Sequence, residues 1–265
     1  MTTPRISYAH LLAKPNPKHI DSLLRFFEEG RSKRGTGGFG VEIEHLPVHN
    51  GDDTAVSYYE ENGVETLLKR IAPYYDKEKE YWENGHLVGL GREGIAVSLE
   101  PGGQVECSLG ILKTPQELLT LYRSFRRDID PVLDELGFRL VNYGYQPKSG
   151  FADVKVNPKD RYDAMTHYLG RVGQFGPRMM RCSASTQVSI DYVDEQDSID
   201  KLRLGTIIGP ILAWYFRNTP YFEGAPNPWP LLRQRMWDYL DPQRSNVIPG
   251  LFDKRFGWEE YAIDV

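Results

Sequence analysis

Two glutamates, Glu42 and Glu44, interrupt the otherwise apolar run FGVEIEHLPV at residues 39–48. If this run is a strand, side chains alternate between its faces, so both carboxylates point the same way. Clustered carboxylates repel and raise each other's pKa unless a cation lies between them. Hard divalent ions such as Mg2+ take oxygen ligands and bridge substrate phosphates. The spacing is compatible with a Mg2+–nucleotide site, although the pattern alone favours an ordinary solvated sheet face.

A second pair of glutamates lies in the stretch IAVSLEPGGQVECSLG, residues 95–110. Its two strand patterns are joined by a Pro-Gly-Gly turn that suits a hairpin. Glu100 falls on the polar face of the first strand, and Glu106 falls on the polar face of the second. The hairpin therefore adds two carboxylates to the candidate site.

The stretch RCSASTQVSIDY, residues 181–192, repeats the alternation of polar and apolar residues. Arg181, Gln187 and Ser189 share its polar face. Lysine is absent from all three strand regions, although solvated sheet faces usually carry it. This absence keeps a carboxylate-lined binding face open as the alternative to an ordinary wet face.

Helices and strands that must position these residues are mixed without regular βαβ alternation, which predicts an α+β fold with a mainly antiparallel sheet. The expected helices cover residues 16–29, 62–72, 114–137, 159–169, 195–217 and 229–240. The expected strands cover residues 39–48, 94–100, 104–110, 138–145 and 181–192.

The clearest helix begins at Thr114 as N-cap, with Glu117 as its capping-box partner, and stops at Gly137. Pro131 is expected to kink or split this helix. Pro210, together with the glycine before it, is expected to interrupt the helix over 195–217.

Composition limits the classes of partner. The chain has 265 residues, 40% of them hydrophobic, and a formal net charge of -5, which argues against nucleic acid. Cys107 and Cys182 are too few for a disulfide framework, and both fall on apolar faces, so we expect buried thiols in a reducing compartment. No signal-peptide pattern opens the sequence, and the longest apolar run, 206–216, is too short to span a bilayer. We therefore expect a soluble cytoplasmic protein.

Two features that could suggest a ligand site are better explained by structural roles. The stretch GLGREG, residues 89–94, matches the dinucleotide pattern G-x-G-x-x-G, but a strand pattern follows it where such a site needs a helix N-terminus. Turn-forming glycines are the better interpretation. His45 falls on the apolar face of its strand, so we expect a hydrogen-bonded core histidine.

The motifs GVEIEH, SLEPGGQVECS, MMRCSASTQVSIDY, NTPYFEGAPN and WDYLDPQRS, in this order, resemble those of the glutamate–cysteine ligase family. The likeness is to its plant and proteobacterial type and to related actinobacterial ligases. It implies a glutamine synthetase-like fold, in which a curved, mainly antiparallel sheet forms an active-site funnel with helices packed on its outer face. It also implies that residues 1–265 form one catalytic domain.

The resemblance implies an ATP-dependent carboxylate–amine ligase that makes γ-glutamylcysteine from L-glutamate and L-cysteine through a γ-glutamyl phosphate. ATP is then a co-substrate, and two or more Mg2+ ions are cofactors. Matched by motif, the residues implied to bind metal are Glu42, Glu44, Glu100 and Glu106. Those implied to act in catalysis are Arg181 and Glu100. Those implied to contact substrate or nucleotide are Arg181, Gln187, Ser189, Arg233 and Arg244, where surface salt bridges are an equal alternative for the last two.

Relatives of this type usually continue well beyond the segment that matches the last residues of this chain. The chain is then a natural short form, a truncated product, or a subunit, and an incomplete pocket with an exposed sheet edge favours a homo-oligomer or a partner subunit. Two alternatives stay open: a γ-glutamyl ligase that uses another amine, and a non-catalytic protein that kept the metal–nucleotide face.

Overall fold

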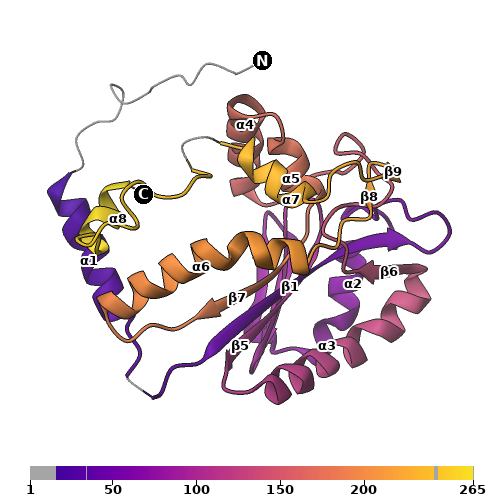
Figure 1. Cartoon of the computed structure of the whole chain (residues 1–265). Coiled ribbons are helices and arrows are strands. Elements are labelled where there is room, and N and C mark those ends of the chain that lie inside the picture. The colour runs from indigo at the N-terminus through magenta and orange to yellow at the C-terminus, as the bar shows by residue number, and fades with distance from the viewer. Residues whose placement is uncertain (1–15, 34, 242–243, 265) are drawn as a thin grey trace. The chain divides into compact units, whose positions relative to one another are not determined.

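The computed structural model describes residues 16–33, 35–241 and 244–264 (Figure 1). The N-terminal stretch used for the signal-peptide prediction lies outside these residues. The helices are α1 (Pro17–Glu29), α2 (Val64–Ile71), α3 (Pro115–Leu136), α4 (Asp160–Val172), α5 (Gly176–Cys182), α6 (Glu195–Tyr215), α7 (Leu232–Asp238) and α8 (Trp258–Asp264), with the 3-10 turns η1 (Ala72–Tyr74) and η2 (Lys77–Lys79). The strands are β1 (Phe39–His49), β2 (Glu80–Glu83), β3 (His86–Arg92), β4 (Ile95–Leu99), β5 (Val105–Leu112), β6 (Phe138–Val141), β7 (Thr186–Ile190), β8 (Tyr221–Phe222) and β9 (Ala225–Pro226).

The chain divides into two compact units. The larger, residues 38–190 and 209–246, holds every strand, and the smaller combines the described part of residues 1–37 with 191–208 and 247–265. In the smaller unit α1 packs on α8, and Ile199, Leu251, Phe256 and Trp258 form a buried core. That the whole chain acts as one catalytic domain stays a prediction.

The main sheet runs β2-β3-β4-β5-β1-β6, with β7 paired to β1, and all its pairings are antiparallel. The sheet is open rather than closed into a barrel. The predicted α+β class with a mainly antiparallel sheet is therefore confirmed.

One face of the sheet carries the main hydrophobic core. Alternation in β1, β4 and β5 turns their apolar side chains towards α2 and α3. The fully buried members of this layer include Val105, Cys107, Leu68, Phe125 and Ile129. By the same alternation the polar side chains of these strands share the opposite face, which leaves that face for the candidate site.

The predicted N-cap and stop of α3 are confirmed, while the Glu117 carboxylate accepts from the Lys113 N–H at 2.7 Å. The Thr114 hydroxyl accepts a hydrogen bond from the Glu117 N–H at 3.2 Å, and Gly137 ends the helix with a φ of 80°. Pro131 lies inside this helix without splitting it.

Two predicted elements are wrong. α6 continues through Pro210, because the preceding Gly209 has no Cβ to clash with the proline ring. The strand predicted over 181–192 begins only at Thr186. Residues 181–182, at the start of the predicted strand, instead form the end of helix α5. This helix has a proline in its first turn and packs against α4.

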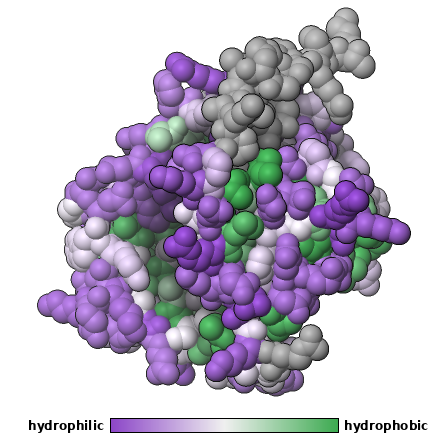
Figure 2. Space-filling view, turned by 90° about the vertical axis from the view of Figure 1, so that its left-hand side faces the viewer, coloured by the Kyte–Doolittle hydropathy of each residue, from purple (hydrophilic) through white to green (hydrophobic). Residues whose placement is uncertain are grey.

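The glycines of GLGREG lie in β3 and in the turn to β4, so the dinucleotide motif is correctly rejected. Of the helices within the described residues, none is long and apolar enough to cross a membrane. The face shown in Figure 2 is mostly hydrophilic, with hydrophobic residues in small groups between the polar ones.

Candidate functional site

The site begins with two carboxylates that face each other across neighbouring strands. Glu44 of β1 is the register partner of Glu106 of β5, and Glu42 lies opposite both Ser108 and Gln187. Directly opposed residues of an antiparallel pair have Cβ atoms about 5 Å apart, and like charges at that separation destabilise a sheet. The fold therefore places two negative charges together at an energetic cost that calls for compensation.

Glu106 is held by hydrogen bonds to only one of its two carboxylate oxygens. Its side chain is 9% exposed, and Oε1 accepts from the Ser108 hydroxyl at 2.6 Å and from the Ser98 hydroxyl at 3.0 Å. Neither bond uses Oε2. The carboxylate is thus fixed in place with one oxygen left for a cation.

Glu44 is held from the side of β7. Its Oε2 accepts from the Ser185 N–H at 2.9 Å, and its Oε1 accepts from the Ser185 hydroxyl at 2.8 Å and from Gln187 Nε2 at 2.9 Å. Burial raises the pKa of Glu44 most, the bonds from Ser185 and the charge of Arg233 lower it, and Glu106 raises it. The pKa of Glu42 is also raised, first by burial and then by Glu106 and Glu44.

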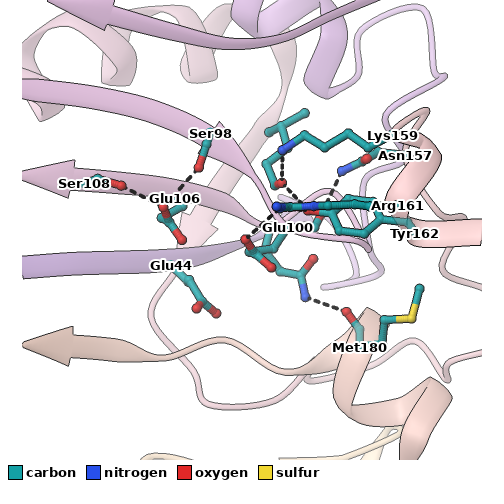
Figure 3. A network of polar contacts seen from close by, with 12 residues as sticks. Glu44, Ser98, Glu100, Glu106, Ser108, Asn157, Lys159, Arg161, Tyr162 and Met180 are labelled. Carbon is teal, nitrogen blue, oxygen red and sulfur yellow. Dashed lines mark hydrogen bonds and ion pairs between the residues drawn. The ribbon is translucent and has the colours of Figure 1, made fainter. Parts of the chain in front are cut away.

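Glu100 follows the end of β4 and joins this group (Figure 3). Burial, then the charges of Glu106 and Glu44, raise the pKa of Glu100 to about 7, against the opposing charges of Arg161 and Lys159. Arg161 Nη2 lies 3.9 Å from Glu100 Oε1. The charges of Glu44 and Glu106 therefore raise the pKa of both Glu42 and Glu100, which links the four predicted metal-binding glutamates electrostatically.

Residues at the start of α4 surround Glu100, and the sequence analysis did not assign them to the site. The carbonyl of Leu99 accepts from Lys159 Nζ at 2.7 Å and from the Tyr162 hydroxyl at 2.8 Å, while Asn157 Nδ2 donates to the Glu100 carbonyl at 2.7 Å. The sequence shows the cations Lys159 and Arg161 at this point. No local pattern in it indicates that this segment folds back onto the hairpin of β4 and β5.

The guanidinium of Arg161 is oriented without being buried. Its carbon lies 4.8 Å from the centre of the Tyr162 ring, and Nη2 donates to the Tyr162 hydroxyl at 2.8 Å. The side chain is 62% exposed. A cation is thus presented beside Glu100 in a position where it can meet an anionic ligand.

The Pro-Gly-Gly turn is fixed against α5. Gln104 Oε1 accepts from the Gly102 N–H at 2.7 Å, and its Nε2 donates to the Ser183 carbonyl at 2.7 Å. A Cβ added at Gly102 would lie 2.1 Å from the Arg181 carbonyl oxygen. The close approach of the two backbones explains the need for glycine at this point.

The structure does not place Arg181 on the polar face of a strand, as its position in the alternating pattern predicted. It belongs to α5, where Nη1 donates to the Phe151 carbonyl at 3.4 Å and Nε is buried without a hydrogen-bond partner. Ser189 lies in β7 opposite Gly40 and is exposed. Their proposed contacts with substrate stay predictions.

The two weaker arginine candidates differ. Arg233 of α7 acts electrostatically on Glu44, and its Nη1 donates to the Gly144 carbonyl at 3.3 Å. Arg244 instead forms an ion pair with Asp241 at 2.8 Å and also contacts the Tyr168 hydroxyl. The two intervening residues of the DPQRS motif, 242–243, lie outside the described residues. Arg233 thus has electrostatic contact with the carboxylate group, while the observed partners of Arg244 belong to a separate ion pair.

The carboxylates of the site supply part of the set of oxygen ligands that Mg2+ requires. No group of three or more His, Cys, Asp or Glu side chains forms a ready metal cage within residues 16–33, 35–241 and 244–264. Mg2+ is usually held by one or two carboxylates, with waters and substrate phosphates supplying the other oxygens. The opposed pair of Glu44 and Glu106 fits an ion of that kind.

The residues predicted to have ordinary structural roles do have them. His45 is fully buried, with Nδ1 3.0 Å from the Val105 carbonyl and Nε2 2.9 Å from the Tyr122 hydroxyl. Burial lowers the pKa of His45 to about 4. Cys107 and Cys182 are free, buried thiols.

Comparisons with known proteins give a consistent result. Residues 38–265 match the model of glutamate-cysteine ligase family 2. The chain is 33% identical over 266 residues to the chloroplastic glutamate–cysteine ligase of Nicotiana tabacum, covering 99% of this chain and 50% of that protein. It is 36% identical over 252 residues to the chloroplastic glutamate–cysteine ligase B of Oryza sativa subsp. japonica and to the chloroplastic ligase of Arabidopsis thaliana, covering 94% of this chain and 50% and 48% of those proteins. The chain spans about half the length of these curated relatives.

Proposed function

The chain belongs to glutamate-cysteine ligase family 2, and from this premise we propose that it is an ATP-dependent ligase that forms γ-glutamylcysteine from L-glutamate and L-cysteine. The observation that carries the proposal is the opposed carboxylate pair, Glu44 and Glu106, on the polar face of the sheet. The relatives named as ligases for glutamate and cysteine support this choice of substrates.

The proposed reaction has two steps. A γ-carboxylate oxygen of glutamate attacks the terminal phosphorus of ATP, and the bond to ADP breaks. The amine of cysteine then attacks the acyl carbon, phosphate leaves, and the amine loses a proton to solvent. Two or more Mg2+ ions, held by the glutamates of the site, would supply neutralisation of the charge that develops on the phosphate oxygens.

Residues of this chain have proposed roles in binding and orientation. Glu44 and Glu106 hold Mg2+, with Glu42 and Glu100 beside them in the same electrostatic group. We assign Arg181, Gln187, Ser189, Arg233 and Arg244 to substrate or nucleotide contacts. The planar donor fork of an arginine suits a carboxylate or phosphate.

We also propose the architecture of the protein and its assembly. A glutamine synthetase-like fold, with the polar sheet face as the wall of a funnel, is the proposed architecture. The chain also associates with a second copy or a partner subunit. A cytoplasmic location stays a prediction, and the relatives are named chloroplastic.

The test is to incubate the purified protein with Mg2+, ATP, glutamate and one amino acid at a time, and to measure phosphate release and the mass of the product. Cysteine is expected to stimulate phosphate release and give γ-glutamylcysteine. Stimulation by another amine alone would favour a ligase of different specificity.

A further candidate is a non-catalytic protein that binds metal and nucleotide, because the opposed carboxylates of Glu44 and Glu106 suit a metal–nucleotide complex whether or not turnover follows. Nucleotide binding in the presence of Mg2+, without turnover for any amine, would support that function and contradict the ligase.

A further inference from the structure

Three asparagines of this chain are followed directly by glycine: Asn50, Asn62 and Asn84. In such a pair the backbone nitrogen of the glycine can attack the side-chain carbonyl carbon of the asparagine. A carbon–nitrogen bond forms to close a cyclic imide, and the amide nitrogen leaves as ammonia with the proton that the attacking nitrogen gives up. Water then opens the imide at either carbonyl and leaves aspartate or isoaspartate. Glycine favours the reaction, because it has no Cβ to obstruct the attack and permits the backbone rotation that ring closure requires.

Asn62 is protected by the glycine that follows it. Gly63 is buried, and its N–H donates to the Glu60 carbonyl at 3.0 Å. A Cβ placed on Gly63 would lie 2.2 Å from the Ser57 carbonyl oxygen, so the backbone packs closely around this residue. Attack on Asn62 would break the hydrogen bond and move a closely packed residue. The side chain of Asn62 is exposed, but the nitrogen beside it is not available.

Asn84 is protected through its own amide. Its Nδ2 donates to the Asp160 carboxylate at 2.7 Å and to the Pro158 carbonyl at 3.4 Å. With its glycine it forms the turn between β2 and β3, and the flanking residues Glu83 and His86 are paired. Loss of ammonia would break both hydrogen bonds, and ring closure would distort a turn that two paired strands hold in place.

Asn50 has neither protection. It lies with Gly51 in the exposed turn that follows β1. Within the part of the chain that the structure describes, neither the Gly51 N–H nor the Asn50 amide nitrogen has a hydrogen-bond partner. The Asn50 side chain is held only through its oxygen, which accepts from Arg139 Nη1 at 3.5 Å, so the leaving nitrogen is free. A Cβ on Gly51 would meet open space, and the turn therefore has room for the rearrangement.

We propose that Asn50 is a site of spontaneous deamidation, and that the fold protects Asn62 and Asn84 from the same reaction. The proposal does not depend on ligase activity. The product carries a new carboxylate beside Arg139, which already forms an ion pair with Asp53. The isoaspartate form also lengthens the main chain of the turn by a carbon atom.

The test is to incubate the folded protein at mildly alkaline pH and to follow each asparagine by mass spectrometry of its proteolytic peptides, with fragmentation to separate aspartate from isoaspartate. Asn50 is expected to react at least about tenfold faster than Asn62 or Asn84, since each protected site must first break hydrogen bonds. In urea the three rates are expected to converge, because the unfolded chain keeps only the shared glycine neighbour. Equal rates in the folded protein, or a preference for Asn50 that persists in urea, would overturn the proposal.

Variants separate the two kinds of protection. Gly51→Ala is expected to slow the reaction at Asn50 by about tenfold, because the new Cβ obstructs the attack. The fold has room for this Cβ, so the variant is expected to unfold in urea as the wild type does. Asp160→Ala removes an acceptor of the Asn84 amide and is expected to speed the reaction there, with Asn50 unchanged as the internal control. An unchanged rate at Asn50 in the first variant, or at Asn84 in the second, contradicts the proposal.

Discussion

Replacing Glu100 by glutamine is expected to stabilise the metal-free protein, and the gain is expected to grow with pH. Glu100 is partly buried beside Glu106 and Glu44, with its side chain 30% exposed, and its pKa is raised from 4.5 to about 7. Below pH 4.5, the pKa of this carboxyl in the unfolded chain, the group is protonated in both the folded and the unfolded state and does not change the free energy of unfolding. As the pH rises from 4.5 to about 7 the unfolded chain loses this proton while the folded protein retains it, so stability falls across this range and levels off above pH 7.

The magnitude follows from the pKa difference. At 1.36 kcal/mol for each pKa unit, the shift corresponds to up to about 3 kcal/mol of unfolding free energy. Glutamine has the same shape and no charge, so the variant avoids this loss. Its advantage over the wild type is expected to be near zero at pH 4.5 and to approach the full value above pH 7.

The assay is urea unfolding followed by circular dichroism in the presence of a chelator, over this pH range. Glu93→Gln, at an exposed glutamate in the turn between β3 and β4, is the matched control and is expected to follow the wild type. Addition of Mg2+ and ADP is expected to stabilise the wild type more than the Glu100 variant. Parallel stability curves for the wild type and Glu100→Gln would refute the electrostatic account of the site.

Three further substitutions test single contacts. Gly102→Ala is expected to cost about 1–3 kcal/mol in urea unfolding, because its Cβ would lie 2.1 Å from the Arg181 carbonyl oxygen, whereas Gly51→Ala meets open space and serves as control. Tyr122→Phe removes the hydroxyl 2.9 Å from His45 Nε2 and is expected to cost about 1 kcal/mol in the same assay; no loss would contradict the assigned hydrogen bond. Ser185→Ala removes the hydroxyl that donates to Glu44, and calorimetry is expected to show about tenfold weaker Mg2+-dependent binding of ADP. Ser183→Ala, whose hydroxyl donates to Met179, is the control, and an equal effect of both serine changes would remove Ser185 from the site.

Local patterns account for what the sequence predicted well. Alternation in β1, β4 and β5 placed Glu42, Glu44 and Glu106 on the polar face and His45 in the core, because a strand inverts its side chains at each residue. Thr114 and the glycine that ends α3 marked that helix correctly, because caps act through neighbouring residues.

Tertiary contacts account for what was missed. Arg181 shares the alternating pattern of β7, but packing of α5 against α4 draws it into a helix. Lys159 and Arg161 approach Glu100 only because α4 folds back on the hairpin, some 60 residues away in the chain. No local spacing encodes such a contact.

The central claim, that the polar sheet face binds a Mg2+–nucleotide complex, is tested most directly by calorimetric titration of the protein with ADP. We expect binding in the presence of Mg2+, its loss when the metal is chelated, and marked weakening in Glu44→Gln and Glu106→Gln. Binding of equal strength without Mg2+, or unchanged binding in both variants, would contradict the account.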